Sequence, residues 1–198
     1  RVHTPCSGWA ILIDMHGVRP SSEALTTPGP VQVAAWLREL VDGGIGAVVL
    51  EASSHALAQY RLDGVSFDVV VFTNLTQDHI EYHGNIDAYF AAKARLVELA
   101  QVNATVIVNQ ADPAWVSLDA AGRRLRTFAV GTSEADVSGV DLKLDSSGAA
   151  FRLIVDGIER QVQMPLLGRY NVENALAAVA AATAVGVPLN EVVERLGT

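Results

Sequence analysis

The sequence predicts an α/β protein with a mostly parallel, doubly wound sheet and an antiparallel meander near residues 134–166. Between residues 30 and 130, short apolar runs alternate with segments of helical period, which is the pattern of strands joined by crossover helices. After residue 134, apolar and polar residues alternate between turn residues, which is typical of an antiparallel meander. The 198 residues are enough for one domain with its own core.

A helix and two strands are expected in the first part of this pattern. The segment from Pro30 to Gly44 has helical period, begins with Pro and ends in two glycines, where these residues are favoured. The run IGAVVLEAS (45–53) is almost continuously apolar and predicts a strand covered on both faces. The run FDVVVFTNLT (67–76) repeats that signal. Upstream, WAILID (9–14) is compatible with a strand.

The rest of the chain continues the alternation and then enters the meander. Ile86 to Ala100 have the apolar spacing of a helix. Turn residues at 146–148 and 156–157 separate the meander strands. The elements expected after the Ile86 helix are, in order, a buried strand (104–113), a short helix, a strand (124–130), the meander (134–166), a long alanine-rich helix (171–187) and a shorter helix (188–196).

Composition limits the functions that the chain can have. Half of the residues are hydrophobic and the formal net charge is −8, so no basic stripe is available for general nucleic-acid binding. Cys6 is the only cysteine, which excludes an internal disulfide and fits a reducing compartment. The most apolar run (175–187) is too short to span a bilayer, and no secretory signal is present. We expect a cytoplasmic monomer that neither enters membranes nor binds nucleic acid.

Polar residues gather at the carboxyl ends of the predicted strands, where open α/β sheets bind ligands. Glu51 ends one such strand, and His79 lies a few residues beyond the next. Mg²⁺ prefers oxygen and takes few protein ligands, so Glu51 is a natural ligand. His79 is a less usual ligand and could equally bond to the backbone. Ser53 and His55 raise the alternative of a hydrolase, but the G-x-S-x-G motif is absent.

Lys93 lies in the middle of the apolar stripe of the predicted helix, between Tyr89 and Leu96. Periodicity leaves two interpretations open. In the first, the stem packs on the apolar face while the ammonium reaches water. In the second, burial lowers the pKa of the amine, and the neutral amine captures carbon dioxide as a carbamate whose oxygens can bind a metal ion.

Asn171 and Asn174 fall in the first turn of the predicted alanine-rich helix. Asn is a good N-cap, which is the simplest explanation for Asn171. Asn174 lies one turn later, where its amide is available to a ligand such as the edge of a base.

Four motifs resemble the central, ATP-binding domain of the Mur ligase family. They are LTTP (25–28), EASSHALAQYRLDG (51–64), VVFTNLTQDHIEYHGNIDAYFAAKARL (70–96) and LLGRYNVENALAA (166–178). The second and third are specific, and they most resemble the MurE type, which adds an amino acid to UDP-N-acetylmuramoyl-L-alanyl-D-glutamate. The resemblance implies an ATP-dependent carboxylate–amine ligase of peptidoglycan synthesis, and hence a part in cell wall biogenesis, cell shape and cell division.

The resemblance also implies roles for individual residues. The contacts implied for the UDP-muramoyl dipeptide are Thr26, Thr27, Ser53, Gln59 and Arg61. Glu51 would bind one Mg²⁺, and His79 with carbamylated Lys93 would bind the second, which makes His79 and Lys93 the expected catalytic residues. The nucleotide contacts implied are Tyr89, Asn171 and Asn174. An inward-facing lysine is then explained by its modified form, which is a metal ligand.

The implied reaction has two steps. ATP phosphorylates the terminal carboxylate to give an acyl phosphate, and the amine of diaminopimelate or lysine displaces the phosphate. The family's phosphate loop, G-x-x-G-K-[ST], does not occur in the sequence. We therefore expect residues 1–198 to be a single central ATPase-type domain. As a fragment without the phosphate loop, the N-terminal UDP-binding domain and the C-terminal amino-acid-binding domain, it should be inactive by itself.

Two alternatives remain at this point. Folylpolyglutamate synthase and cyanophycin synthetase resemble the same core and can carry the modified lysine, although EASSHAL and TNLTQDHIEYHG favour the muramyl type. A non-catalytic module would instead keep the fold and bind the sugar nucleotide without ATP.

Overall fold

The computed structural model of the chain describes residues 13–14, 17–18, 27–76 and 80–197. Two compact units are present. The first contains the chain up to Val106 together with Leu118–Arg124, and the second contains Ile107–Ser117 together with Leu125 and the residues after it. Within the described part of the chain, no helix combines the length and the apolar character needed to cross a membrane.

Residues with strong boundary preferences delimit the helices of the first unit. Its elements are β1 (Ile13–Asp14), β2 (Gly17–Val18), α1 (Pro30–Asp42), α2 (Ser54–Ala58), β3 (Phe67–Phe72), α3 (Ile80–His83), α4 (Ile86–Glu98) and the greater part of β4 (Ala100–Asn109). α1 begins at Pro30 and ends before Gly43, whose N–H donates to the Glu39 oxygen at 2.9 Å. The Asn85 side chain accepts from Ala88 N at 2.8 Å and so caps α4.

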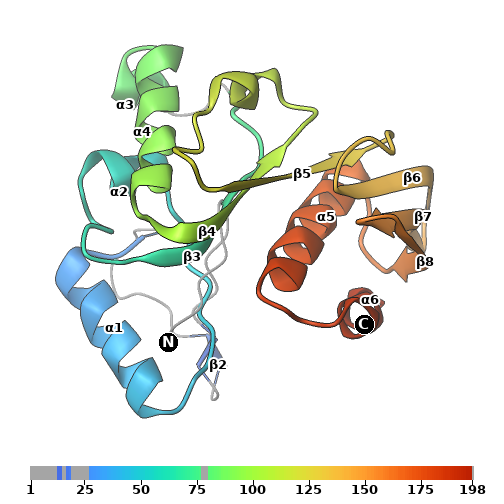
Figure 1. The fold of residues 1–198 in the computed structure, drawn as a ribbon, viewed down its shortest axis with the longest axis horizontal. Helices are drawn as coiled ribbons and strands as arrows, with labels where there is room; N and C mark the ends of the chain where they lie inside the picture. Colours follow the sequence, from blue (N-terminus) through green and yellow to red (C-terminus); the bar gives the residue numbers. More distant parts are fainter. Residues whose placement is uncertain (1–12, 15–16, 19–26, 77–79, 198) are drawn as a thin grey trace. The chain divides into compact units, whose positions relative to one another are not determined.

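β3 and α4 supply large side chains to the core of the first unit. Phe67, Phe72 and Leu96 are each 1% exposed, and burying such a side chain contributes roughly 1.5–3 kcal/mol. α4 contacts α2, and Figure 1 shows α2, α3 and α4 grouped beside β3 and β4. The apolar stripe of α4 is therefore turned inward, as its periodicity predicted.

The second unit contains the predicted meander and the alanine-rich helix. Its elements are the end of β4, the 3₁₀ helix η1 (Pro113–Ser117), most of β5 (Arg124–Val130), β6 (Val137–Asp145), β7 (Gly148–Val155), β8 (Ile158–Met164), α5 (Arg169–Ala184) and α6 (Leu189–Leu196). β5 pairs with β6 in parallel, while β6, β7 and β8 are antiparallel. α5 contacts β6 and β7, and α6 contacts β8 (Figure 1). Strands β3 to β8 are hydrogen-bonded in chain order.

These elements confirm the predicted α/β class with a parallel pair leading into an antiparallel meander. The turn at Asp156-Gly157 illustrates why the sequence was informative. Their φ angles of 48° and 85° are the positive values of a two-residue type I′ turn, which Asp and Gly tolerate. The register follows, with Val155 opposite Ile158.

Three local predictions are wrong. Residues 45–53 carry a single bridge at Ala47 instead of a strand, although Val48 and Leu50 are buried. An apolar run indicates that a segment is buried, whereas a strand also needs a neighbouring strand that is hydrogen-bonded to it along its length. The helix predicted to reach Ala100 ends at Glu98, and Ala100 begins β4. Ile86, expected on the buried face of that helix, is 42% exposed because it occupies the first helical position.

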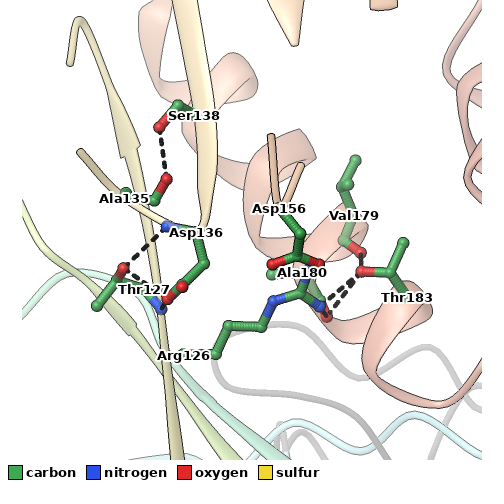
Figure 2. Close-up of polar contacts among 9 residues, drawn as sticks. All are labelled: Arg126, Thr127, Ala135, Asp136, Ser138, Asp156, Val179, Ala180 and Thr183. Carbon is green, nitrogen blue, oxygen red and sulfur yellow. Dashed lines mark hydrogen bonds and ion pairs between the residues drawn. The ribbon is translucent and has the colours of Figure 1, made fainter. Parts of the chain in front are cut away.

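Arg126 connects three elements of the second unit (Figure 2). Its side chain starts on β5 and is only 5% exposed. Nη1 donates to the Ala180 oxygen at 3.1 Å and to Thr183 Oγ1 at 2.7 Å, and Nη2 donates to Asp156 Oδ2 at 2.7 Å. A buried cation thus ties β5 to α5 and to the β7–β8 turn.

Candidate functional site

Four of the residues predicted to bind substrate come together in the first unit. Thr27 precedes α1, Ser53 caps the N-terminus of α2, Gln59 caps its C-terminus, and Arg61 follows two residues later. Two further site residues named from the sequence, Thr26 and His79, lie outside the described residues.

The Thr27 hydroxyl organises the entry into α2. Thr27 is 2% exposed, and its Oγ1 donates to the Glu51 backbone oxygen at 2.9 Å. The same Oγ1 lies 3.1 Å from Ser53 Oγ and accepts from Ser53 N at 3.3 Å. Ser53 Oγ in turn accepts from Ala56 N at 3.2 Å, which caps the helix. The backbone of Glu51 and Ser53 is therefore fixed where the chain turns into α2.

Arg61 continues this cluster toward Tyr82. Its Nη1 donates to the Thr27 oxygen at 2.9 Å, and its Nη2 donates to Gln59 Oε1 at 2.5 Å. Gln59 Nε2 then donates to Tyr82 Oη at 2.9 Å. The motif around residues 70–96 contains Tyr82, but nothing in the sequence assigned it to this cluster. A guanidinium among hydroxyl and amide groups suits an anionic, hydroxyl-rich ligand.

Lys93 lies on the inward side of α4, close to the same part of the chain. Its Nζ donates to the Ala52 backbone oxygen at 3.3 Å, and its side chain is half-buried. Burial lowers the pKa of Lys93 from its ordinary value of 10.5, and the carboxylate of Glu51 opposes part of that shift. The Glu51 carboxylate and the Lys93 amine therefore lie close enough to interact electrostatically.

The residues present fit magnesium only if Lys93 is modified. As an ammonium, Lys93 would repel a divalent cation beside Glu51, whereas a carbamate on the same nitrogen is an anion with oxygen donors. Among the residues that the structure describes, no group of three His, Cys, Asp or Glu side chains is gathered for a metal ion. A site of the predicted kind therefore depends on Lys93 as a ligand, together with Glu51 and the undescribed His79.

Aromatic and imidazole rings from α2, α3 and α4 pack together beside Gln59. His55 lies 4.0 Å from Tyr82 and 5.7 Å from His83, measured between ring centroids. His83 stacks on Tyr89 at 5.3 Å with an interplanar angle of 24°. Tyr89 is 4% exposed and lies one helical turn before Lys93. The ring contacts thus link α2, α3 and α4.

A hollow of about 390 Å³ adjoins Arg61. It is lined by Pro30, Ala34, Leu37, Arg38, Val41, Arg61, Asp63, Gly64 and Val65. Its charged groups are already engaged, since Arg38 pairs with Asp42 and Asp63 pairs with Arg95. The hollow therefore offers mainly an apolar wall next to Arg61.

The predicted adenine contacts lie in the second unit, at the start of α5. The N-cap of α5 is Gly168, so the interpretation of Asn171 as the N-cap is wrong, and its Nδ2 donates instead to the Leu167 oxygen at 2.8 Å. Gly168 has a φ of 90°, and a Cβ there would lie 2.7 Å from the Tyr170 ring, which explains why the cap is glycine. Asn174 is exposed one turn later.

Comparisons with known proteins give the same family as the motifs. The family described as "Mur ligase middle domain" matches residues 7–182. A Xylella fastidiosa (strain 9a5c) protein named UDP-N-acetylmuramoyl-L-alanyl-D-glutamate--2,6-diaminopimelate ligase is 43% identical over 177 residues, which are 87% of this chain and 36% of the relative. A Deinococcus radiodurans protein named UDP-N-acetylmuramyl-tripeptide synthetase is 41% identical over 161 residues, or 81% of this chain and 32% of the relative.

Solved structures agree with this result. A UDP-N-acetylmuramoyl-L-alanyl-D-glutamate--2,6-diaminopimelate ligase superposes with a TM-score of 0.79 and 33% identity, covering 91% of this chain and 38% of that one. The chain thus spans only about a third of the length of the curated relatives it matches, for example 36% of the Xylella fastidiosa protein.

Proposed function

Because the chain belongs to the Mur ligase middle-domain family, we propose that it is the ATP-using part of an enzyme that adds diaminopimelate to UDP-N-acetylmuramoyl-L-alanyl-D-glutamate. The observation that carries the proposal is the hydrogen-bonded cluster of Thr27, Ser53, Gln59 and Arg61, which the family resemblance names as substrate contacts. The choice of diaminopimelate over lysine rests on the names of the relatives, at 43% identity for the first.

In this proposal the cluster binds the anionic UDP-muramoyl dipeptide. The Arg61 guanidinium offers fixed N–H donors, and its bonds to Thr27 and Gln59 hold it in one orientation before the ligand arrives. The Ser53 hydroxyl is assigned to sugar or carboxylate groups, and Thr27, whose hydroxyl is buried and bonded to Glu51 and Ser53, supports it from behind. Thr26 is assigned the same role from the family pattern.

Glu51, His79 and Lys93 would hold two magnesium ions, with Lys93 as a carbamate. Bound Mg²⁺ would neutralise charge on the phosphoryl group as it moves from ATP to the substrate carboxylate. The lowered pKa of Lys93 supports the modification, because only a neutral amine reacts with carbon dioxide. Asn171 and Asn174 are assigned to the adenine of ATP, and Tyr89 to the wall of the nucleotide site.

The enzyme so proposed acts as a monomer in the cytoplasm. It takes part in peptidoglycan synthesis and therefore in cell shape and division. The test is ADP formation by the complete polypeptide containing this chain, with UDP-N-acetylmuramoyl-L-alanyl-D-glutamate and either diaminopimelate or lysine. Turnover with a folate and glutamate, or binding of the sugar nucleotide without any ATP binding in calorimetry, would replace the proposal with one of the two alternatives.

The substitution Arg61→Ala tests the substrate assignment. We expect the KM for UDP-muramoyl dipeptide to rise by about 30-fold or more, because the proposed charge-assisted contact to the anionic ligand is removed, while the KM for ATP changes little. Steady-state kinetics of the complete polypeptide measures both constants. Equal weakening of both substrates would contradict the assignment.

A further inference from the structure

The segment that presents Gln59 and Arg61 has an unusual backbone. We call Leu57–Asp63 the α2 exit segment. Tyr60, between the two candidate substrate residues, has a φ of 58°, in the left-handed region that favours glycine. Tyr60 N donates to the Leu57 oxygen at 3.2 Å and Arg61 N to the Ala56 oxygen at 2.9 Å, so this conformation ends the helix. A tyrosine adopts it only when surrounding contacts compensate for the strain.

One side chain of α4 supplies those contacts. The Arg95 side chain is 20% exposed, and its Nη1 donates to the Leu57 oxygen. Its Nη2 lies 3.0 and 3.3 Å from the two carboxylate oxygens of Asp63. The guanidinium carbon also stands 4.1 Å from the centroid of the Tyr60 ring. Arg95 therefore contacts the α2 exit segment before, at and after the strained residue.

We propose that Arg95 is a positioning residue, which holds the α2 exit segment so that Gln59 and Arg61 are oriented for the UDP-muramoyl substrate. This inference rests on the function proposed above. Arg95 bonds to neither of those two residues, so it acts through the backbone between them. It also joins the segment to α4, the helix that carries Lys93 two residues earlier. Substrate contacts and the proposed metal ligand are thereby kept on one rigid unit.

The chemistry of the side chain matters as much as its charge. A guanidinium is planar and carries several N–H donors, so it can stack on Tyr60 while bonding to a carbonyl and a carboxylate. A lysine ammonium keeps the charge but cannot make this combination of contacts. Arg95→Lys should therefore behave like Arg95→Met.

The first experiment compares substrate constants in the complete polypeptide. Arg95→Met should raise the KM for UDP-N-acetylmuramoyl-L-alanyl-D-glutamate by about tenfold, because misplacing Arg61 weakens substrate binding, and should leave the KM for ATP within about twofold. Glu98→Gln is the matched control, since Glu98 is 70% exposed and pairs with the same guanidinium at 3.5 Å on its outer side. It should change neither constant. A parallel rise of both constants, or no change in either, would overturn the inference.

A second experiment separates this inference from the proposed function. Adding Tyr60→Gly to Arg95→Met should recover most of the substrate KM, since glycine adopts the left-handed conformation without support. Hydrogen exchange of peptides within residues 56–65, measured without substrate, should be faster in Arg95→Met than in the wild-type protein. If the wild-type protein has no ligase activity but the exchange difference is still found, the proposed function is wrong. The role of Arg95 in holding the α2 exit segment is then still supported. Unchanged exchange would refute the role of Arg95 itself.

Discussion

Each unit of the molecule contains a basic side chain that is at least partly buried. The two side chains differ in how many hydrogen-bond acceptors surround them. Arg126 in the second unit donates to a carbonyl, a hydroxyl and a carboxylate, at distances of 2.7–3.1 Å. Lys93 in the first unit makes one longer hydrogen bond of 3.3 Å to Ala52 within the described part of the chain. Its pKa is lowered by burial, with only partial compensation from Glu51.

We propose from this difference that Arg126 serves the fold and that Lys93 serves the chemistry proposed above. A buried charge normally requires partners, and removing them leaves a large desolvation cost. Arg126 meets most of that requirement, because both of its Nη groups are hydrogen-bonded and only its buried Nε has no partner in the described part of the chain. It also connects three elements, as a structural residue should. Lys93 has a single hydrogen-bond acceptor within the described part of the chain, and burial lowers its pKa, which favours the neutral amine that carbamate formation needs. The comparison can be tested by neutralising each cation.

The largest expected effect is on activity when Lys93 is replaced. Lys93→Met in the complete polypeptide should reduce kcat by about 1,000-fold or more, because a ligand to the proposed metal centre is lost. The melting temperature should stay the same or rise, since methionine fills similar space without a polar end in an apolar stripe. Steady-state kinetics and thermal unfolding measure the two quantities. Retained activity would remove the distinction between the two cations.

Replacing Arg126 should give the opposite result. Arg126→Met should destabilise the second unit by about 2 kcal/mol, because charge-assisted hydrogen bonds from a buried group are lost. This value already includes a reduction for solvent screening, since the Asp156 side chain is 55% exposed. Hydrogen exchange of β5 and α5 peptides should accelerate by about 30-fold. Arg152→Met is the matched control, since Arg152 pairs with carboxylates that are 66% and 56% exposed. It should leave exchange almost unchanged, and equal effects would mean that burial of Arg126 adds nothing.

Much of the fold follows from local sequence signals. The start of α1 at Pro30, the turn at Asp156-Gly157 and the inward position of Lys93 depend on residues close in sequence, so they were predictable. The absence of a strand over residues 45–53 could not be predicted in this way, because strand pairing involves residues that are distant in sequence.

The site was predicted only in part, for the same physical reason. The family motifs named Thr27, Gln59 and Arg61, and the structure brings these residues together. The motifs did not indicate that Arg95 contacts a segment 32 to 38 residues away, nor that Tyr82 bonds to Gln59. Such partnerships arise only when α2, α3 and α4 have packed. The interpretation of Asn171 as the N-cap was wrong because the cap is Gly168, whose positive φ is seen only in the backbone geometry.

The smallest effect concerns the pH dependence of stability, and it tests the Lys93 side of the comparison directly. In the unfolded chain Lys93 titrates near 10.5, and in the folded chain its pKa is lower. Between these two values the unfolded chain holds more protons, so the free energy of unfolding rises with pH across that window, by at most about 1.4 kcal/mol per pH unit. Below the folded pKa, both states are protonated and the full cost of burying the ammonium remains.

Urea unfolding at a series of pH values measures the free energy of unfolding of the wild-type complete polypeptide and of its Lys93→Met variant. Bicarbonate and divalent metal ions are left out of the buffer. The variant has no ammonium at this position, so its stability does not depend on this titration. As the pH approaches 10.5, the wild-type protein should therefore gain stability relative to the variant. All other titratable groups are common to the two proteins, so their contributions cancel in the difference. A constant difference across the series would mean that Lys93 is solvated as an ordinary lysine, and the contrast with Arg126 would then be one of geometry alone.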